Sequence, residues 1–188
     1  MGTWEELDTE LTVSNDVSAL DDLVNECNGE FADIFEDVIK DANDLKTAID
    51  EGSKEGIQIT ANRLMSRESR YATDPSHRAK NSRASGLLAS SIQVEAYSEY
   101  QYVVGTDLSH FYPLCVEYGR GEVHPIPPNT RLRFYGQGGY LIYPLMSSEA
   151  PAYPFVQPAY DEIVDLIEGD GFGVFREVCK NIEDVLGG

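Results

Sequence analysis

The chain has few basic residues and no long apolar run, and each shortage excludes a class of protein. Its 188 residues include 14 lysines and arginines against 33 aspartates and glutamates, so the formal net charge is −19. Such a surface repels nucleic acid and anionic membranes, which disfavours general DNA binding. No apolar stretch approaches the ~18 residues that a membrane-spanning helix needs. Because the segment MGTWEELDTEL is acidic where a secretion signal is basic, we expect the protein to be intracellular while it is made.

The chain is also poor in residues that could build a reaction centre. Its three cysteines are far apart and form no CxxC pair (Cys27, Cys115 and Cys179), which disfavours a zinc site or a disulfide framework. The three histidines lie in loop-like segments without ligand spacing. GQGG lacks the lysine of a phosphate-binding loop, and no GxSxG occurs. We therefore predict no enzyme activity, no metal and no cofactor.

The scarcity of lysine points to one environment in which so acidic a surface is useful. Only five of the 14 basic residues are lysines, and the other nine are arginines. In very high salt, dense hydrated carboxylates keep a protein soluble, and their mutual repulsion is screened within a few ångströms. A soluble acidic protein of any source stays an alternative. Our hypothesis is a protein of a saline cytoplasm.

The first part of the chain is dominated by helical periodicity. Residues 1–17 lack a sustained period and are expected to form an N-terminal arm or a short docking segment. From Ser18 to Ile49, apolar residues recur at three- and four-residue steps, which predicts a helix of about eight turns. Two glycines in DEGSKEG, residues 50–56, predict a kink or short turn. A second helix is expected over 57–72.

The remainder alternates strands with turns and then returns to helix. SIQVEAY and YQYVVG predict one hairpin, and RLRFY and YLIYPL predict a second one. The expected fold is α+β, a small curved antiparallel sheet with the long N-terminal helix and the C-terminal helices packed around it. One domain would span 18–188, with a long helix region (18–72), a sheet region (86–146) and C-terminal helices (155–186).

One group of cations stands out against the acidic background. Six of the 14 basic residues fall within 21 positions: Arg63, Arg67, Arg70, Arg78, Lys80 and Arg83. They could form internal ion pairs with the acidic first helix. They could also form a basic surface that meets a neighbouring subunit or passing DNA, where charge gives register more than affinity.

The stretch APAYPFVQPAYDEI, residues 150–163, puts three prolines and three aromatic rings directly before a predicted helix. Proline lacks a backbone N–H and holds the residue before it extended, so this segment is stiff and loses few conformations on ordering. We expect its rings to pack into the subunit or onto a neighbour (Tyr153, Phe155 and Tyr160).

Four segments in order, SGLLASSIQV, FYPLCVEYGRG, HPIPPNTRLRF and APAYPFVQPAYDEI, resemble the neck, or tail-completion, family of tailed viruses, which includes the lambda Z-like minor tail components. The resemblance covers about residues 60 to 165. The matching positions are Ser85, Gly86, Leu88, Tyr112, Val116, Glu117, Tyr118, Gly119, His124, Ile126, Pro128, Leu132, Phe134, Pro154, Phe155, Pro158 and Ala159. Tyr153 and Leu87 depart from it, because the family carries basic residues there.

The resemblance implies a structural virion protein. Identical subunits, twelve by analogy with the portal, would form a ring that joins the portal and head-closure rings to the tail tube, and DNA would leave through its lumen. It also implies oligomer contacts by Tyr112, Tyr118 and His124, in addition to the three rings above. With the acidity, it suggests a virus of a halophilic archaeon, assembled in the host cytoplasm. The alternatives are the six-fold tail terminator or head-closure ring of the same virion and, more distantly, a small halophilic α+β enzyme or binding module.

Overall fold

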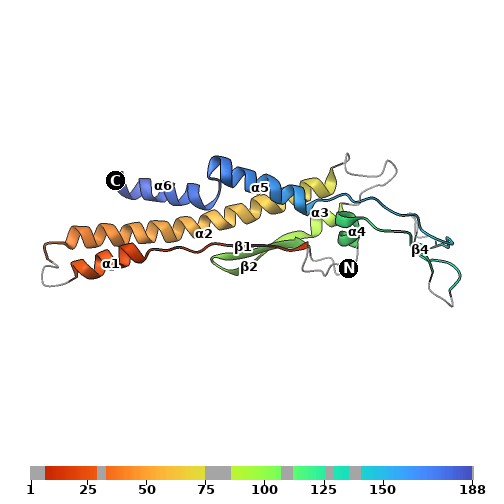
Figure 1. The fold of residues 1–188 in the computed structure, drawn as a ribbon, viewed down its shortest axis with the longest axis horizontal. Coiled ribbons are helices and arrows are strands. Elements are labelled where there is room, and N and C mark those ends of the chain that lie inside the picture. The colour runs from red at the N-terminus through yellow and green to blue at the C-terminus, as the bar shows by residue number, and fades with distance from the viewer. Residues whose placement is uncertain are drawn as a thin grey trace.

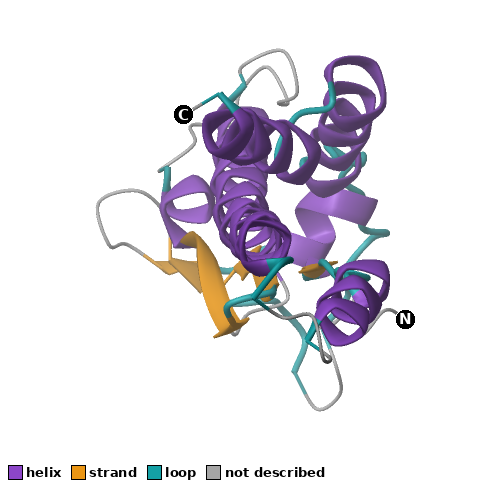
Figure 2. Ribbon diagram, turned by 90° about the vertical axis from the view of Figure 1, so that its left-hand side faces the viewer, coloured by secondary structure: helices purple, strands orange, loops and turns teal. Residues whose placement is uncertain are grey.

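The protein is an elongated α+β structure built along one long helix (Figure 1). The computed structural model describes residues 7–28, 33–74, 86–106, 112–125, 129–135 and 141–187. The long helix α2 (Glu36–Thr73) lies between two layers, with the C-terminal helices on one side and a three-stranded sheet on another (Figure 2). The expected fold class, α+β with a long N-terminal helix and C-terminal helices around a small antiparallel sheet, is confirmed.

The expected first helix is in fact two helices. Helix α1 (Ser18–Cys27) ends before Asn28, and α2 begins at Glu36. Asparagine is among the weaker helix formers, and Asn28 stands directly after the last residue of α1. An ion pair between Lys46 and Asp21 links α2 to α1.

The expected turn at 50–56 is wrong, because α2 runs unbroken through both glycines. Their role is close packing. A Cβ added at Gly52 would lie 2.7 Å from the Val178 Cα atom, and one at Gly56 would lie 2.3 Å from the Val174 Cα atom. Both valines belong to α6 (Val174–Leu186). The missing side chains therefore let two helix backbones touch, which offsets the weak helix propensity of glycine.

The sheet has the order β1–β3–β2, and all its pairings are antiparallel. The hairpin of β2 (Ile92–Ser98) and β3 (Gln101–Thr106) confirms the prediction for this region. Strand β1 (Thr9–Thr12) adds to the free edge of β3, with Leu11 opposite Tyr102. From residue 7 onward the segment docks on the body, the second alternative expected for it, because Leu7 is buried and β1 pairs with β3. Residues 1–6 lie outside the described residues.

Three short helical elements complete the body. Helix α3 (Leu87–Ser91) precedes β2, and α4 (Tyr112–Tyr118) follows β3 along the chain. Helix α5 (Val156–Asp170) packs on α2 and leads into α6. The core lies where α2, α3, the sheet and α5 meet, and its buried residues are Ala61, Leu64, Leu88, Ile92, Val104, Phe155, Ala159 and Ile163.

Candidate assembly surfaces

Glu117 of α4 joins two of the segments that carry the family resemblance. Its Oε2 atom accepts hydrogen bonds from the backbone N–H groups of Phe155, at 2.6 Å, and Val156, at 3.1 Å. Its Oε1 atom accepts one from Gln157 at 3.3 Å. N–H groups at the start of a helix have no partner within it, and a negative charge is favourable there. The buried Glu117 carboxylate therefore caps α5 from a distant part of the chain.

The same junction continues through backbone contacts. The Tyr153 N–H donates to the Val116 carbonyl oxygen at 2.7 Å, and Arg120 and Ala150 exchange two backbone hydrogen bonds of 2.9 and 2.8 Å. Gly119 has a φ of +73°, and a Cβ there would lie 2.8 Å from the Ala150 carbonyl oxygen. Both its backbone angle and its contact require glycine. These backbone hydrogen bonds therefore clamp the two chain segments together where they leave the body.

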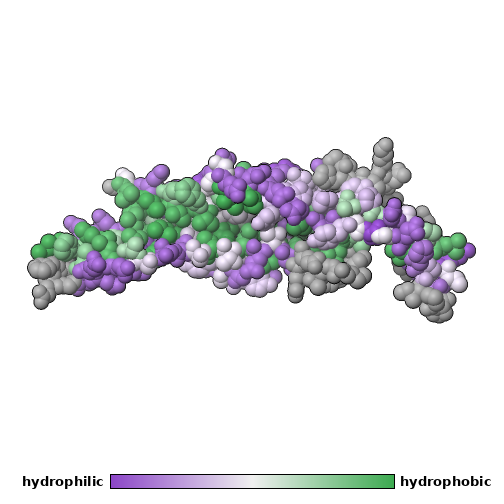
Figure 3. Space-filling model, in the orientation of Figure 1, coloured by the Kyte–Doolittle hydropathy of each residue, from purple (hydrophilic) through white to green (hydrophobic). Residues whose placement is uncertain are grey.

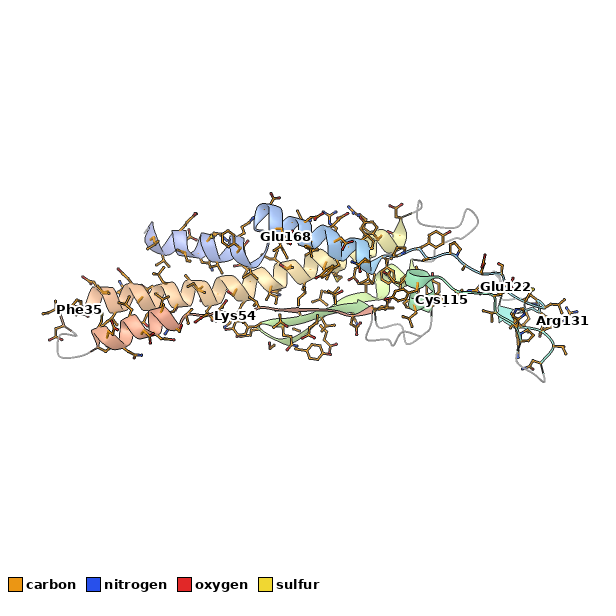
Figure 4. The ribbon with its side chains drawn as sticks, viewed as in Figure 1. Phe35, Lys54, Cys115, Glu122, Arg131 and Glu168 are labelled. Carbon is orange, nitrogen blue, oxygen red and sulfur yellow. The ribbon has the colours of Figure 1, made fainter. Side chains whose placement is uncertain are left out.

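Beyond this clamp the described residues between 120 and 150 (120–125, 129–135 and 141–150) form an extended arm. Backbone hydrogen bonds between Val123 and Ser147, 3.0 and 2.9 Å long, hold its two sides together. Farther out, β4 (Phe134–Tyr135) pairs with β5 (Leu141–Ile142), which confirms the second predicted hairpin. The arm projects past one end of the body, where Glu122 and Arg131 are labelled (Figure 4).

The arm has little contact with the body of its own subunit. Among the arm residues whose exposure the structure describes, 120–125, 129–133, 141 and 143–150, none is buried. Several large apolar side chains are exposed on it: Val123, Tyr143, Leu145 and Met146, of which Leu145 is 66% exposed. Exposed apolar side chains that gather on a projecting element mark an interaction surface.

A second apolar surface lies on the body, between α2 and α6. It is a groove of about 450 Å³, lined by the segment after β1, one face of α2 and the α5–α6 connection. Leu11, Ile57 and Val178 are among the residues that line it. Phe175, which also lines it, is 68% exposed. Hydrophobic surface extends from here over α6 and the adjoining part of α2 (Figure 3).

The aromatic residues expected at an interface divide into two groups. Tyr112, Tyr118 and Tyr160 are exposed, and Tyr153 is half-buried. Phe155 is 1% exposed and belongs to the core, which is the first of the two placements expected for it. It comes immediately before α5 on the buried side, where the Glu117 cap covers its backbone.

His124 and the cationic group are placed as follows. His124 is exposed on the arm, 3.4 Å from the Glu122 carboxylate. Arg67 and Arg70 form ion pairs of 3.1 and 2.5 Å with Glu162 of α5, which also accepts a hydrogen bond from Tyr71. These hydrogen bonds and charges hold the pKa of Glu162 below its ordinary value.

The rest of the cationic group is less constrained. Arg63 is exposed and lies over the Phe172 ring, 5.5 Å from its centre. Arg78, Lys80 and Arg83 lie outside the described residues. For Arg67 and Arg70 the internal ion pairs that we expected exist, but their partner is on α5 instead of the first helix.

Sequence reasoning missed a buried carboxyl group in the core. Glu68 is 0% exposed, and neither of its oxygens has a hydrogen-bond partner among the described residues. Burial raises its pKa to about 8, and the charges of Glu117 and Asp8 add to the shift. Glu68 follows Ala61 and Leu64 at helical spacing, so its position on the buried face of α2 could have been found.

The described residues contain neither a metal site nor a membrane-spanning helix. They contain no group of three His, Cys, Asp or Glu side chains arranged to hold a metal ion. No helix within these ranges is long and apolar enough to cross a membrane. No protein-family profile, curated protein sequence or solved structure matches the chain.

Proposed function

We propose that this protein is a structural subunit of the neck of a tailed virus. Copies of it form a ring, twelve-fold by analogy with the portal, that joins the head-closure side to the tail tube. The observation that carries the proposal is the Glu117 junction, because it unites two separate segments of the family resemblance in one structural unit. Because a carboxylate in α4 caps α5, the two segments depend on each other structurally and are expected to occur together.

The shape of the subunit supports the proposal. The body is elongated along α2, and the arm extends it further at one end (Figure 1). Both the arm and the groove expose apolar side chains that a monomer leaves in water. Such surfaces are costly in an isolated subunit and useful in an assembly, where neighbours cover them.

The charge of the protein suits a channel for DNA. A net charge of −19 per chain gives the inner wall of a ring the same sign as the phosphate backbone. Like charges let DNA pass without binding. The same charge destabilises the contact between copies in dilute buffer, so assembly is expected in molar salt, where repulsion is screened to about 3 Å.

The proposal is tested on virus particles. Gold-labelled antibodies against the full chain should mark the junction of head and tail in purified tailed particles of the source culture. Label confined to the host cytosol, with none on particles, would contradict the proposal.

A point variant sharpens this test. Tyr153→Ala should leave the monomer folded and reduce the yield of joined particles, because the half-buried ring can contribute to a neighbour's surface. Tyr97→Ala is the matched control, since Tyr97 is 64% exposed on β2, away from the junction. Equal particle yields for both variants would remove Tyr153 from the interface.

A further inference from the structure

We infer that the arm of one copy lies in the α2–α6 groove of the next copy, an inference that rests on the proposed ring. The arm offers apolar side chains that its own body does not cover, with Leu145 the most exposed of them. The groove offers an apolar lining that no segment of its own chain fills among the described residues. In the contact, the groove covers the exposed apolar side chains of the arm, and the arm fills the open groove.

The arm is less acidic than the helices of the body. Residues 120–150 contain three arginines and two glutamates in a chain of net charge −19. By contrast, α1, α2, α5 and α6 each carry more acidic than basic residues, and the groove between them is lined by uncharged side chains. An acidic neighbour therefore repels the arm less than it repels these helices. In molar salt charges are screened within about 3 Å, so apolar burial supplies most of the free energy of the contact.

The contact must join different copies. The arm projects beyond one end of the body (Figure 4), whereas the residues of α2 that line the groove, Ile49, Ser53, Ile57 and Thr60, lie in the middle of that helix. An arm cannot fold back over that distance while Arg120 and Ala150 clamp its base. A contact between two different surfaces of identical subunits is heterologous, and it propagates until a ring closes.

The arm is also prepared for binding before it meets a neighbour. Backbone hydrogen bonds tie Val123 to Ser147 and Leu132 to Pro144, and β4 pairs with β5. A segment held in one shape loses little conformational freedom on binding. This favours a defined seat in the groove over a loose apolar contact.

Mixing two defective variants tests the inference. Leu145→Asp removes the arm contact and Phe175→Asp removes the groove contact, and both side chains are more than half exposed, so folding is spared. Each change should raise the concentration at which half the chains assemble by about ten- to a hundredfold. Leu87→Asp, at an exposed position on α3, is the control and should assemble like the unaltered chain.

The mixture gives the decisive result. One variant keeps a working groove and the other keeps a working arm, so an equimolar mixture should form dimers and stop there. Masses are measured by sedimentation in molar potassium chloride, and circular dichroism checks that each variant is folded. Unaltered rings from either variant alone, or a mixture that contains no dimers, would overturn the inference and leave the proposed ring intact. A full chain that stays monomeric at every salt concentration would instead contradict the proposed function.

A second measurement does not depend on disruptive changes. In a chain whose own three cysteines are replaced by serine, Leu145→Cys and Phe175→Cys together should give disulfide-linked multimers under mild oxidation. Each single replacement should give none through this pair. Rings that form without such links would place the arm elsewhere on the neighbour.

Discussion

The body and the arm of this protein obey different packing rules. In the body, glycines let α6 touch α2, and buried side chains from helices and sheet form one core. In the arm, none of the residues whose exposure the structure describes is buried, and the chain is held by a few backbone hydrogen bonds and a short hairpin. Large apolar side chains are exposed on it, among them Tyr143, Leu145 and Met146.

The difference separates residues that stabilise the folded monomer from residues that are available for contacts with other molecules. The body contains the buried core, so changes in that core should alter folding. The arm adds little to the folded monomer, so changes in it should alter only contacts with other molecules. The Glu117 junction connects the two, because it caps a body helix at the point where the arm returns.

The largest effect is expected from the ionisation of Glu68 in the body. Its pKa is about 8 in the folded chain and near the ordinary 4.5 when unfolded. Between these values the folded state keeps a proton that the unfolded state releases, so stability falls as pH rises from 4.5 to 8 and then levels. The loss attributable to this group amounts to roughly 5 kcal/mol. Urea unfolding at pH 5, 6.5 and 8.5, at constant salt, measures it.

Glu68→Gln should remove this part of the pH dependence, because the amide does not ionise. Glu51→Gln, at an exposed position of the same helix, should keep it. If the Glu68→Gln protein loses as much stability with rising pH as the unaltered chain, then Glu68 is not the titrating group.

The next effect concerns the contact between α2 and α6. Gly56→Ala should cost about 2–3 kcal/mol, because the new methyl group would lie 2.3 Å from the Val174 backbone and force α6 away. Gly169→Ala, in α5 with open space around it, should instead stabilise by about 0.5–1 kcal/mol through helix propensity. Thermal unfolding of both variants compares them. Equal melting temperatures would mean that α6 does not pack closely on α2.

A smaller effect is expected at the junction. Glu117→Gln weakens the cap of α5, because a neutral amide oxygen replaces a carboxylate that accepts three N–H groups. The free energy of unfolding should fall by about 1–2 kcal/mol. Glu149→Gln, exposed on the arm, is the control. Hydrogen exchange at the backbone amides of residues 155–157 should rise only in the first variant, and unchanged protection there would contradict the cap.

The smallest effect on folding is expected in the arm. Leu145→Ala should change the free energy of unfolding of the monomer by no more than about 0.5 kcal/mol, since the side chain is 66% exposed. The same change should weaken assembly. A loss of monomer stability as large as that of Gly56→Ala would mean that the arm contributes to folding as much as the body does.

Most elements of the fold were predictable from local patterns, and the errors have identifiable causes. The hairpins and the C-terminal helices follow from side-chain alternation and three- to four-residue periods. The glycines of α2 were misread, because their effect depends on α6, more than a hundred residues away in the sequence. Strand β1 was missed because four residues, TELT, are too short for a periodic signal.

The candidate surfaces were less predictable. The exposed tyrosines at 112, 118 and 160 agree with the sequence, whereas Phe155 is in the core. The Glu117 cap joins residues 38 to 40 positions apart, and no local pattern in either segment predicts it. The groove is made by three separate segments, so only the tertiary structure shows it.

The most direct test of the central claim, that this chain is completed by copies of itself, is the mass of the full-length protein in molar salt. Native mass spectrometry or sedimentation at micromolar concentration should give a closed ring, twelve times the 20.9 kDa chain by analogy with the portal. Electron images of the same sample should show a central channel. A single species at the mass of one chain, at every concentration and salt level, would contradict the account.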